Sequence, residues 1–159
     1  MLGKSYLVAT AVILLLKLVS GGDKGEVGAV SRGYEEINGT EYYLSTESRT
    51  RDSAKLDCEG RNMTLVEFDG NNKWTTISSW ISNNIAYRKN WYWTSGILAQ
   101  NSEKWVWEAS GEEIKQFFWA PSQPNENSKN GSVCINFIID FGGWDDDYCD
   151  QFTMGHICE

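Results

Sequence analysis

The sequence predicts a disulfide-stapled α+β domain, and three observations carry this prediction. Two stretches with helical spacing of apolar residues come first in the mature chain, and short aromatic-rich strands separated by turns follow them. Four cysteines are distributed along the same part of the chain. This length fits a single domain, which we expect over residues 34–159.

The N-terminus predicts a secretory signal peptide over residues 1–21. Lys4 precedes an apolar run at residues 7–16, which is the layout of such segments. Lys17 interrupts the run well short of the roughly 20 apolar residues that a membrane-spanning helix needs. We therefore expect a secreted, extracellular protein with no membrane span after signal removal, and a flexible leader at residues 22–33.

The first predicted strand accompanies a turn, and the first helix follows it. Residues 37–44 contain the turn-forming pair Asn38-Gly39 and then an aromatic run that suits a strand. Residues 50–61 contain no helix breaker and place Ala54 and Cys58 four positions apart on one side. This spacing predicts the first helix.

A short strand and the second helix come next. Residues 63–68 alternate enough to predict a strand. Asn71 or Asn72 is expected to cap the second helix, which ends by Asn83. Its buried face is predicted to contain three apolar residues, Trp74, Ile77 and Ile81.

The second half of the chain predicts short strands at residues 91–93, 105–107 and 133–139, and a final strand around His156. Five tryptophans of this half are expected to be core residues: Trp93, Trp105, Trp107, Trp119 and Trp144. Residues 97–130 show little periodic structure, and a long loop in a compact domain is usually functional. We therefore expect the ligand-binding loop there.

Charge and side-chain chemistry narrow the function. The formal net charge of -8 argues against nucleic acid or anionic lipid as partners, and it is compatible with a bound cation. Glu108, Glu112 and Glu113 have no fixed separation, and His156 has no patterned nucleophile. We therefore expect a binding protein with no catalytic residues.

The four cysteines predict a disulfide framework. In an oxidising export route an even number of cysteines suggests full pairing, and three pairings are possible. None of the cysteines has the close spacing of a zinc ribbon or a thioredoxin-type site, so zinc and redox chemistry are disfavoured.

Ordered motifs carry a resemblance to a known family. They are Trp93-Thr94-Ser95-Gly96, Trp105-Val106-Trp107, Trp119-Ala120, Gln123-Pro124-Asn125, Cys134, Trp144-Asp145-Asp146, Cys149 and Cys158-Glu159. This succession resembles the C-type lectin-like domain family over residues 34–159. The resemblance implies two helices with short antiparallel strands and a long binding loop. It also implies two disulfides, Cys58–Cys158 and Cys134–Cys149.

In sugar-binding members of the family, oxygen ligands around a cis proline hold calcium and hydrogen-bond two sugar hydroxyls. The resemblance assigns these roles to four residues, which are expected to serve as both metal and ligand contacts: Gln123, Asn125, Asp145 and Asp146. Such oxygen atoms suit calcium, which takes six to eight of them. Calcium is therefore the expected cofactor, and the bond before Pro124 is expected to be cis.

Three departures from the family pattern leave the ligand open. Gln123-Pro124-Asn125 is a hybrid of the mannose-type and galactose-type triplets, so the sugar class stays undecided. Ser132 stands where the family usually has a glutamate ligand, and Asp145 stands where asparagine is usual. Two hypotheses follow. The first is a calcium-assisted lectin, for instance in innate recognition, and the alternative is a module that has lost sugar binding and recognises an extracellular protein.

Three glycosylation sequons begin at Asn38, Asn62 and Asn130. Asn130 lies between the Gln123-Pro124-Asn125 triplet and Cys134, so a glycan there would crowd the expected sugar site. This sequon favours the protein-binding alternative.

Overall fold

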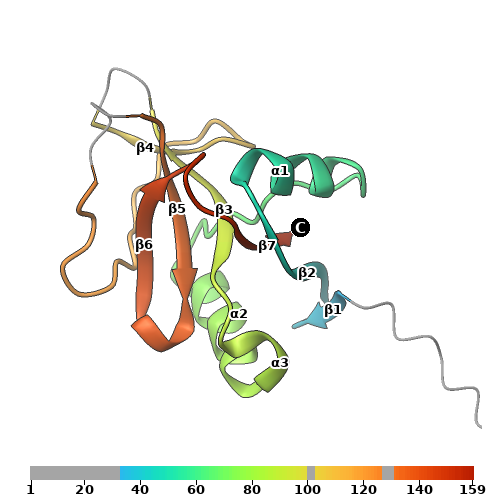
Figure 1. Ribbon diagram of the computed structural model, residues 1–159. Helices are drawn as coiled ribbons and strands as arrows, with labels where there is room; N and C mark the ends of the chain where they lie inside the picture. The colour runs from blue at the N-terminus through green and yellow to red at the C-terminus, as the bar shows by residue number, and fades with distance from the viewer. Residues whose placement is uncertain (1–32, 100–102, 127–130) are drawn as a thin grey trace, which may run out of the picture. The chain divides into compact units, whose positions relative to one another are not determined.

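The computed structural model describes residues 33–99, 103–126 and 131–159, all within one unit, Ser31–Glu159 (Figure 1). The expected signal peptide, most of the expected leader and the Asn130 sequon residue lie outside these ranges. Among the described residues, no helix is long and apolar enough to cross a membrane.

The fold begins with a hairpin of β1, Tyr34–Ile37, and β2, Thr40–Arg49. Asn38 and Gly39 form its two-residue turn with φ values of 53° and 79°, the left-handed conformations that such hairpin turns require. The sequence predicted this turn, but strands lie on both sides of it. The second strand continues to Arg49, beyond the predicted limit.

Helix α1, Arg51–Glu59, lies within the predicted range. Thr50 caps it, because its hydroxyl accepts a hydrogen bond from the Ser53 backbone N–H. Helix α2, Asn71–Asn83, ends where predicted. Its predicted cap is wrong, since the extended residue Gly70 precedes it without a side-chain hydrogen bond.

A short third helix, α3, Ile85–Arg88, was not predicted. It follows α2 after a single extended residue, Asn84, whose backbone leaves the helical region and thereby separates the two helices.

One mixed sheet contains all the strands. The later ones are β3, Tyr92–Leu98; β4, Trp105–Trp107; β5, Val133–Ile138; β6, Gly143–Tyr148; and β7, Met154–Cys158. A 3-10 turn, η1, Ile139–Phe141, joins β5 to β6. The strand order is β1-β2-β7-β3-β5-β6, and β4 pairs with β3. The β3–β7 pair is parallel and the other pairs are antiparallel.

Two strand predictions were incomplete. Residues 63–68 do not form a strand, and only Leu65 makes an isolated bridge, to Cys158. The segment forms backbone hydrogen bonds with two different strands. The Val66 N–H donates to the Ile157 carbonyl of β7, and the Val66 carbonyl accepts from the Ser95 N–H of β3. Strand β6 was not predicted, since its acidic residues have low strand propensity. Its unbroken pairing with β5 forms it nevertheless.

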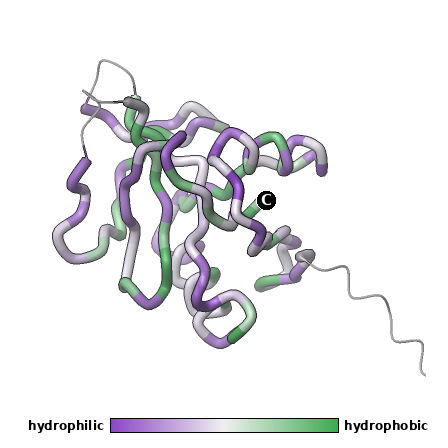
Figure 2. The backbone as a smooth tube through the Cα atoms, in the orientation of Figure 1, coloured by the Kyte–Doolittle hydropathy of each residue, from purple (hydrophilic) through white to green (hydrophobic). Residues whose placement is uncertain are grey.

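The core lies on both faces of the sheet. One cluster packs α2 against aromatic residues of β5 and β6, including Phe137 and Trp144. The other packs α1 around Trp93 and both disulfides. Four of the expected core tryptophans are confirmed, since Trp93, Trp105, Trp107 and Trp144 are buried, whereas Trp119 is only half-buried. Figure 2 shows β5 coloured mostly hydrophobic, beside a hydrophilic β6.

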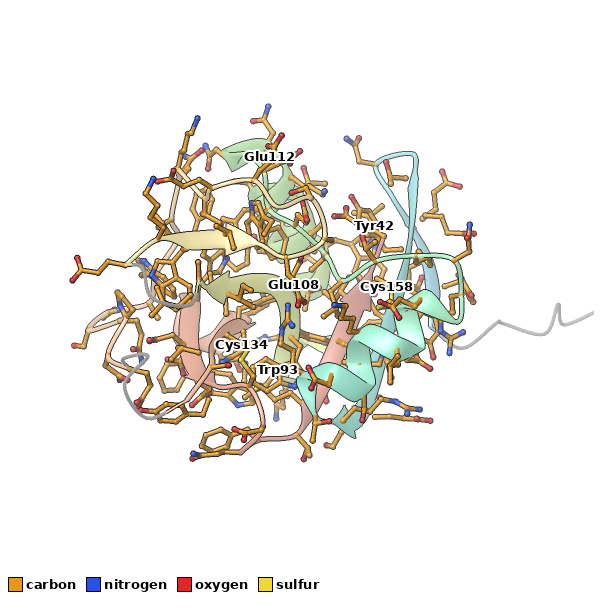
Figure 3. All side chains as sticks on the ribbon, turned by 90° about the horizontal axis from the view of Figure 1, so that it is seen from above. Tyr42, Trp93, Glu108, Glu112, Cys134 and Cys158 are labelled. Atoms are coloured by element: carbon orange, nitrogen blue, oxygen red, sulfur yellow. A yellow bond between two sulfur atoms is a disulfide. The ribbon has the colours of Figure 1, made fainter. Side chains whose placement is uncertain are left out.

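Both disulfides have the pairing that the resemblance implied. Cys58 in α1 is bonded to Cys158 in β7, and Cys134 in β5 is bonded to Cys149 just after β6. Cys158 lies beside α1, and Cys134 lies near Trp93 (Figure 3). The first bond ties the N-terminal helix to the last strand, and the second closes the base of the β5–β6 hairpin.

Candidate ligand site on the edge strand

Part of the expected binding loop, residues 118–126, lies along β6, the edge strand of the sheet (Figure 1). Trp144 exchanges backbone hydrogen bonds with the loop: its N–H donates to Phe118 at 2.6 Å, and its carbonyl accepts from Ala120 at 2.8 Å. The loop and β6 approach each other so closely that a Cβ at Gly143 would overlap the Phe118 carbonyl oxygen. Glycine at position 143 therefore allows the loop to dock on β6.

The Asp146 carboxylate holds the loop at its ligand-bearing turn. It is 1% exposed, and its Oδ1 accepts the Asn125 backbone N–H at 2.8 Å while its Oδ2 accepts the Glu126 N–H at 2.9 Å. Hydrogen bonds to a charged acceptor contribute about 1.5–3 kcal/mol each. Asp146 thus fixes the backbone of the loop as well as offering oxygen lone pairs.

Gln123 and Asn125 flank Pro124 within this turn. The Gln123-Pro124 bond is cis, as the resemblance implied. The Gln123 N–H donates to the Ala120 carbonyl at 3.1 Å, but the side-chain Oε1 is buried and has no hydrogen-bond partner among the described residues. A buried acceptor left without a partner costs about 1–3 kcal/mol, and a ligand would satisfy it. The Asn125 residue is exposed.

Asp145 lies on the other face of β6. Successive strand residues point to opposite faces, so Asp145 and Asp147 share the face opposite Asp146. On that face the Asn136 amide donates to Asp147 Oδ2 at 3.0 Å. The structure therefore brings Asn125 and Asp146 into contact, places Gln123 in the same turn, and sets Asp145 on the other side of the edge strand.

The three consecutive aspartates are electrostatically strained. Burial, and next the charge of Asp145, raise the pKa of Asp147 to about 6. Burial also raises the pKa of Asp145 and of Asp146, and the Glu126 carboxylate adds to both shifts. No ion pair within the described ranges involves any of the three aspartates. A bound cation would offset this repulsion.

The donor set fits a hard cation. The loop and β6 offer amide oxygens from Gln123 and Asn125 and carboxylates from Asp145 and Asp146, which are the oxygen types that calcium prefers. Ser132 is exposed just before β5 and offers only a hydroxyl at the usual glutamate position. The set thus contains fewer anionic ligands than the family pattern.

A cluster of potential soft-metal ligands lies between α1 and β7, and its residues have structural roles. Cys58, Cys158 and His156 bring ligand atoms within 4.8 Å of one another, but both sulfurs belong to one disulfide. His156 is fully buried, and its Nε2 lies 2.9 Å from Asp57 Oδ2. We assign these residues a structural role.

Asn136 in β5 is a buried polar residue next to the site that the sequence analysis did not identify. It is 0% exposed, its Oδ1 has no partner among the described residues, and it lies opposite Asp145. The signal was present, because Asn136 is the one amide in the apolar run of β5. A buried amide in such a strand requires polar neighbours.

No protein-family model matches the chain. Human E-selectin is 30% identical over 159 residues, covering 95% of this chain and 22% of the selectin. Chicken hepatic lectin is 28% identical over 134 residues, covering 83% of this chain and 60% of that lectin. The chain thus spans about a fifth of the selectin's length and three fifths of the hepatic lectin's.

Solved structures show the same fold. The mouse scavenger receptor C-type lectin carbohydrate-recognition domain has a TM-score of 0.66 at 23% identity, covering 80% of this chain and 93% of that one. A complex of SPL-1 with GlcNAc has a TM-score of 0.65 at 23% identity, covering 80% and 92%.

The calcium-independent lectin SPL-2 from Saxidomus purpuratus has a TM-score of 0.64 at 22% identity, covering 79% of this chain and 89% of that one. The fold therefore occurs in a lectin that works without calcium. With its strand order, two disulfides and lectin relatives, the chain belongs to the C-type lectin-like domain family.

Proposed function

We propose that the domain is a calcium-assisted carbohydrate-binding module of a secreted protein. Its proposed ligands are Gln123, Asn125 and Asp146 at the turn, whereas Asp145, the fourth expected ligand, lies on the other face of β6 and acts on the site through its charge. The observation that carries the proposal is the Asp146 carboxylate, which holds the backbone of the Gln123-Pro124-Asn125 turn against β6. The accompanying assignment of residues 1–21 as signal peptide, 22–33 as leader and 34–159 as the domain is part of the same proposal.

The site residues supply complementary hydrogen-bonding groups for a sugar. The exposed Asn125 amide offers N–H donors to a hydroxyl oxygen, whereas carboxylates accept the hydroxyl protons. When bound, calcium would supply the positive charge that polarises the sugar hydroxyls. The Asp146 clamp keeps the turn in place before the ligand arrives, which lowers the ordering cost of binding.

The relatives support the sugar-binding part of the proposal. SPL-1 forms a complex with GlcNAc, and the relatives compared above are a selectin and a hepatic lectin. Because the chain covers a minor part of human E-selectin, the proposal concerns the domain, and roles of the whole selectin do not transfer.

Calorimetric titration with calcium, followed by a glycan array with and without chelator, tests the proposal. We expect calcium-dependent heat and at least one glycan whose binding the chelator abolishes. Extracellular calcium modules have dissociation constants of about 10⁻⁴ to 10⁻³ M, so titrations should reach the millimolar range. An absence of both signals would overturn the proposal.

A matched pair of variants assigns the signal to the site. Asp146→Asn removes the charge that holds the turn, whereas Asp140→Asn makes the same change in η1, where Asp140 pairs with Arg88 at 3.0 Å. We expect calcium binding to weaken about tenfold or more in the first variant and to stay unchanged in the second.

Recognition of an extracellular protein is the second candidate, and one surface feature favours it. Phe117 is 38% exposed and stacks on Trp119 with an interplanar angle of 10°, in the segment that leads to the site. Exposed aromatic pairs are common at protein interfaces. Replacing Asn125 and Asp146 with alanine discriminates the two candidates: binding of an extracellular protein that persists unchanged would favour the second, and its loss together with glycan binding would leave the second without support.

A further inference from the structure

A hollow lies between α2 and the η1–β6 connection. Its volume is about 370 Å³, and its walls include Trp74, three serines of α2, Asn83 and Gly143. This volume is within the range of small-molecule sites. The hollow is separate from the Gln123-Pro124-Asn125 turn, none of whose residues line it.

The lining contains no charged residue, although the chain has 14 basic and 22 acidic ones. An ionic ligand would therefore find no partner for its charge, and burying a charge without a partner is costly. A purely apolar ligand would cover serine hydroxyls and leave them without hydrogen bonds. The chemistry that remains is that of a neutral ligand rich in hydroxyl groups.

Two hydroxyls of α2 are available to such a ligand. Ser79 and Ser82 are exposed, and their hydroxyls form no hydrogen bond among the described residues. Asn83 uses one amide hydrogen on the Ser79 carbonyl at 2.9 Å, which leaves its Oδ1 as an acceptor. Each hydroxyl can both donate and accept, so these groups match the alternating needs of vicinal sugar hydroxyls.

Trp74 adds a rigid aromatic surface to the same hollow. Its ring stacks on Phe118 at 5.7 Å and meets Phe68 and Phe137 edge-on at 5.1 Å and 5.2 Å. It is only partly buried, so part of the ring stays open to the hollow. A fixed apolar face beside free hydroxyls suits a pyranose, whose C–H groups are apolar and whose rim is polar.

The wall opposite α2 is formed partly by bare backbone. Gly142 and Gly143 have no side chains in this wall, and a Cβ at Gly142 would meet no other atom within 4 Å. The hollow is therefore bounded here by backbone atoms alone.

We propose that this hollow binds one residue of a neutral saccharide, with the Ser79 and Ser82 hydroxyls as hydrogen-bonding groups and Trp74 as the stacking surface. Because the lining carries no carboxylate, binding here requires no calcium. The hollow therefore extends the carbohydrate specificity of the domain beyond the proposed calcium site, and it functions when that site is empty of metal.

A glycan array probed in the presence of chelator tests the inference with the protein expressed from the full sequence. Three proteins are compared: the unaltered chain, the double variant Ser79→Ala/Ser82→Ala, and the control Asn72→Ala. Alanine is the best helix former, so the double variant should fold. Asn72 lies on α2 but lines a different hollow, with Tyr42 and Glu159.

We expect at least one neutral glycan to bind despite the chelator, with affinity about tenfold lower in the double variant and unchanged in Asn72→Ala, because two hydrogen bonds are lost. In an NMR titration with that glycan, the Trp74 indole signal should shift. No neutral glycan bound under chelator, or equal binding by the double variant, would overturn the inference. Neither result affects the calcium proposal, which rests on glycan binding that the chelator abolishes and on the heat of calcium binding.

Discussion

The half-buried carboxylates near α1 have lowered pKa values, whereas those of the edge strand β6 have raised pKa values. Near α1, burial alone would raise the pKa of Asp57 and of Glu108, but hydrogen bonds from Arg61 and His156 to Asp57, and from Arg51 to Glu108, lower both values. At β6, Asp145 and its two neighbours have raised pKa values. In the first region cationic side chains compensate the carboxylate charges. In the second region the carboxylates lack such partners among the described residues, and a bound cation would compensate them.

This difference separates a stabilising region from a binding region. Arg51 is 3% exposed and joins α1 to two other segments, through Glu108 just after β4 at 2.8 Å and through the Ser95 carbonyl of β3 at 3.0 Å. The β6 aspartates instead remain without a described cationic partner, beside a loop with a buried and unpaired Gln123 oxygen. Stability and ligand binding are therefore expected to respond to different substitutions.

The largest expected effect is on the α1 side. Arg51→Met leaves Glu108 and two backbone carbonyls without their buried partner, so we expect about 3–5 kcal/mol loss in the free energy of unfolding. Urea denaturation measures it. The control Arg88→Met breaks the exposed pair with Asp140 and should cost less than about 1 kcal/mol. Equal losses in the two variants would contradict the contrast between the regions.

A substitution in β6 is expected to increase the free energy of unfolding. Asp147→Asn removes a disfavoured charge and keeps an oxygen that can accept the Asn136 bond. After allowance for solvent screening, we expect the calcium-free protein to gain about 1–2 kcal/mol at pH 7. Urea denaturation in chelator measures this gain. A loss of stability would show that the aspartate charge is already compensated.

The sequence accounted for much of the fold and less of the site. The helix at 50–61, the strand at 105–107 and the cysteine order carry strong local signals, and all correspond to elements of the structure. Strand β6 could not be predicted from local propensity, because pairing with β5 determines it.

Because β6 was not predicted, the arrangement of the site residues was not predicted either. With 145–147 read as a loop, all the acidic side chains could converge on one point, whereas a strand alternates them between two faces. Asn125 and Asp146 are adjacent through a backbone bond that no sequence pattern indicates. The placement of Asp145 beside Asn136 likewise depends on strand register.

A smaller effect is expected from pH. The folded pKa of Asp147, about 6, lies above the ordinary value of 3.8, so its protonation favours the folded state. Its stabilising contribution is complete below pH 3.8 and is lost as pH rises through 6. The stability difference between Asp147→Asn and the unaltered chain should therefore shrink from pH 7 to pH 4. A constant difference across that range in chelator would contradict this assignment.

Thermal unfolding with and without calcium tests the central claim most directly. If the β6 carboxylates bind calcium at about 10⁻⁴ to 10⁻³ M, then 10 mM calcium should stabilise the protein by about 1.4–2.7 kcal/mol and raise Tm by several degrees. Asp140→Asn should show the same rise, and Asp146→Asn should show little or none. A Tm unaffected by calcium in the unaltered chain, or raised equally in all three proteins, would contradict the account.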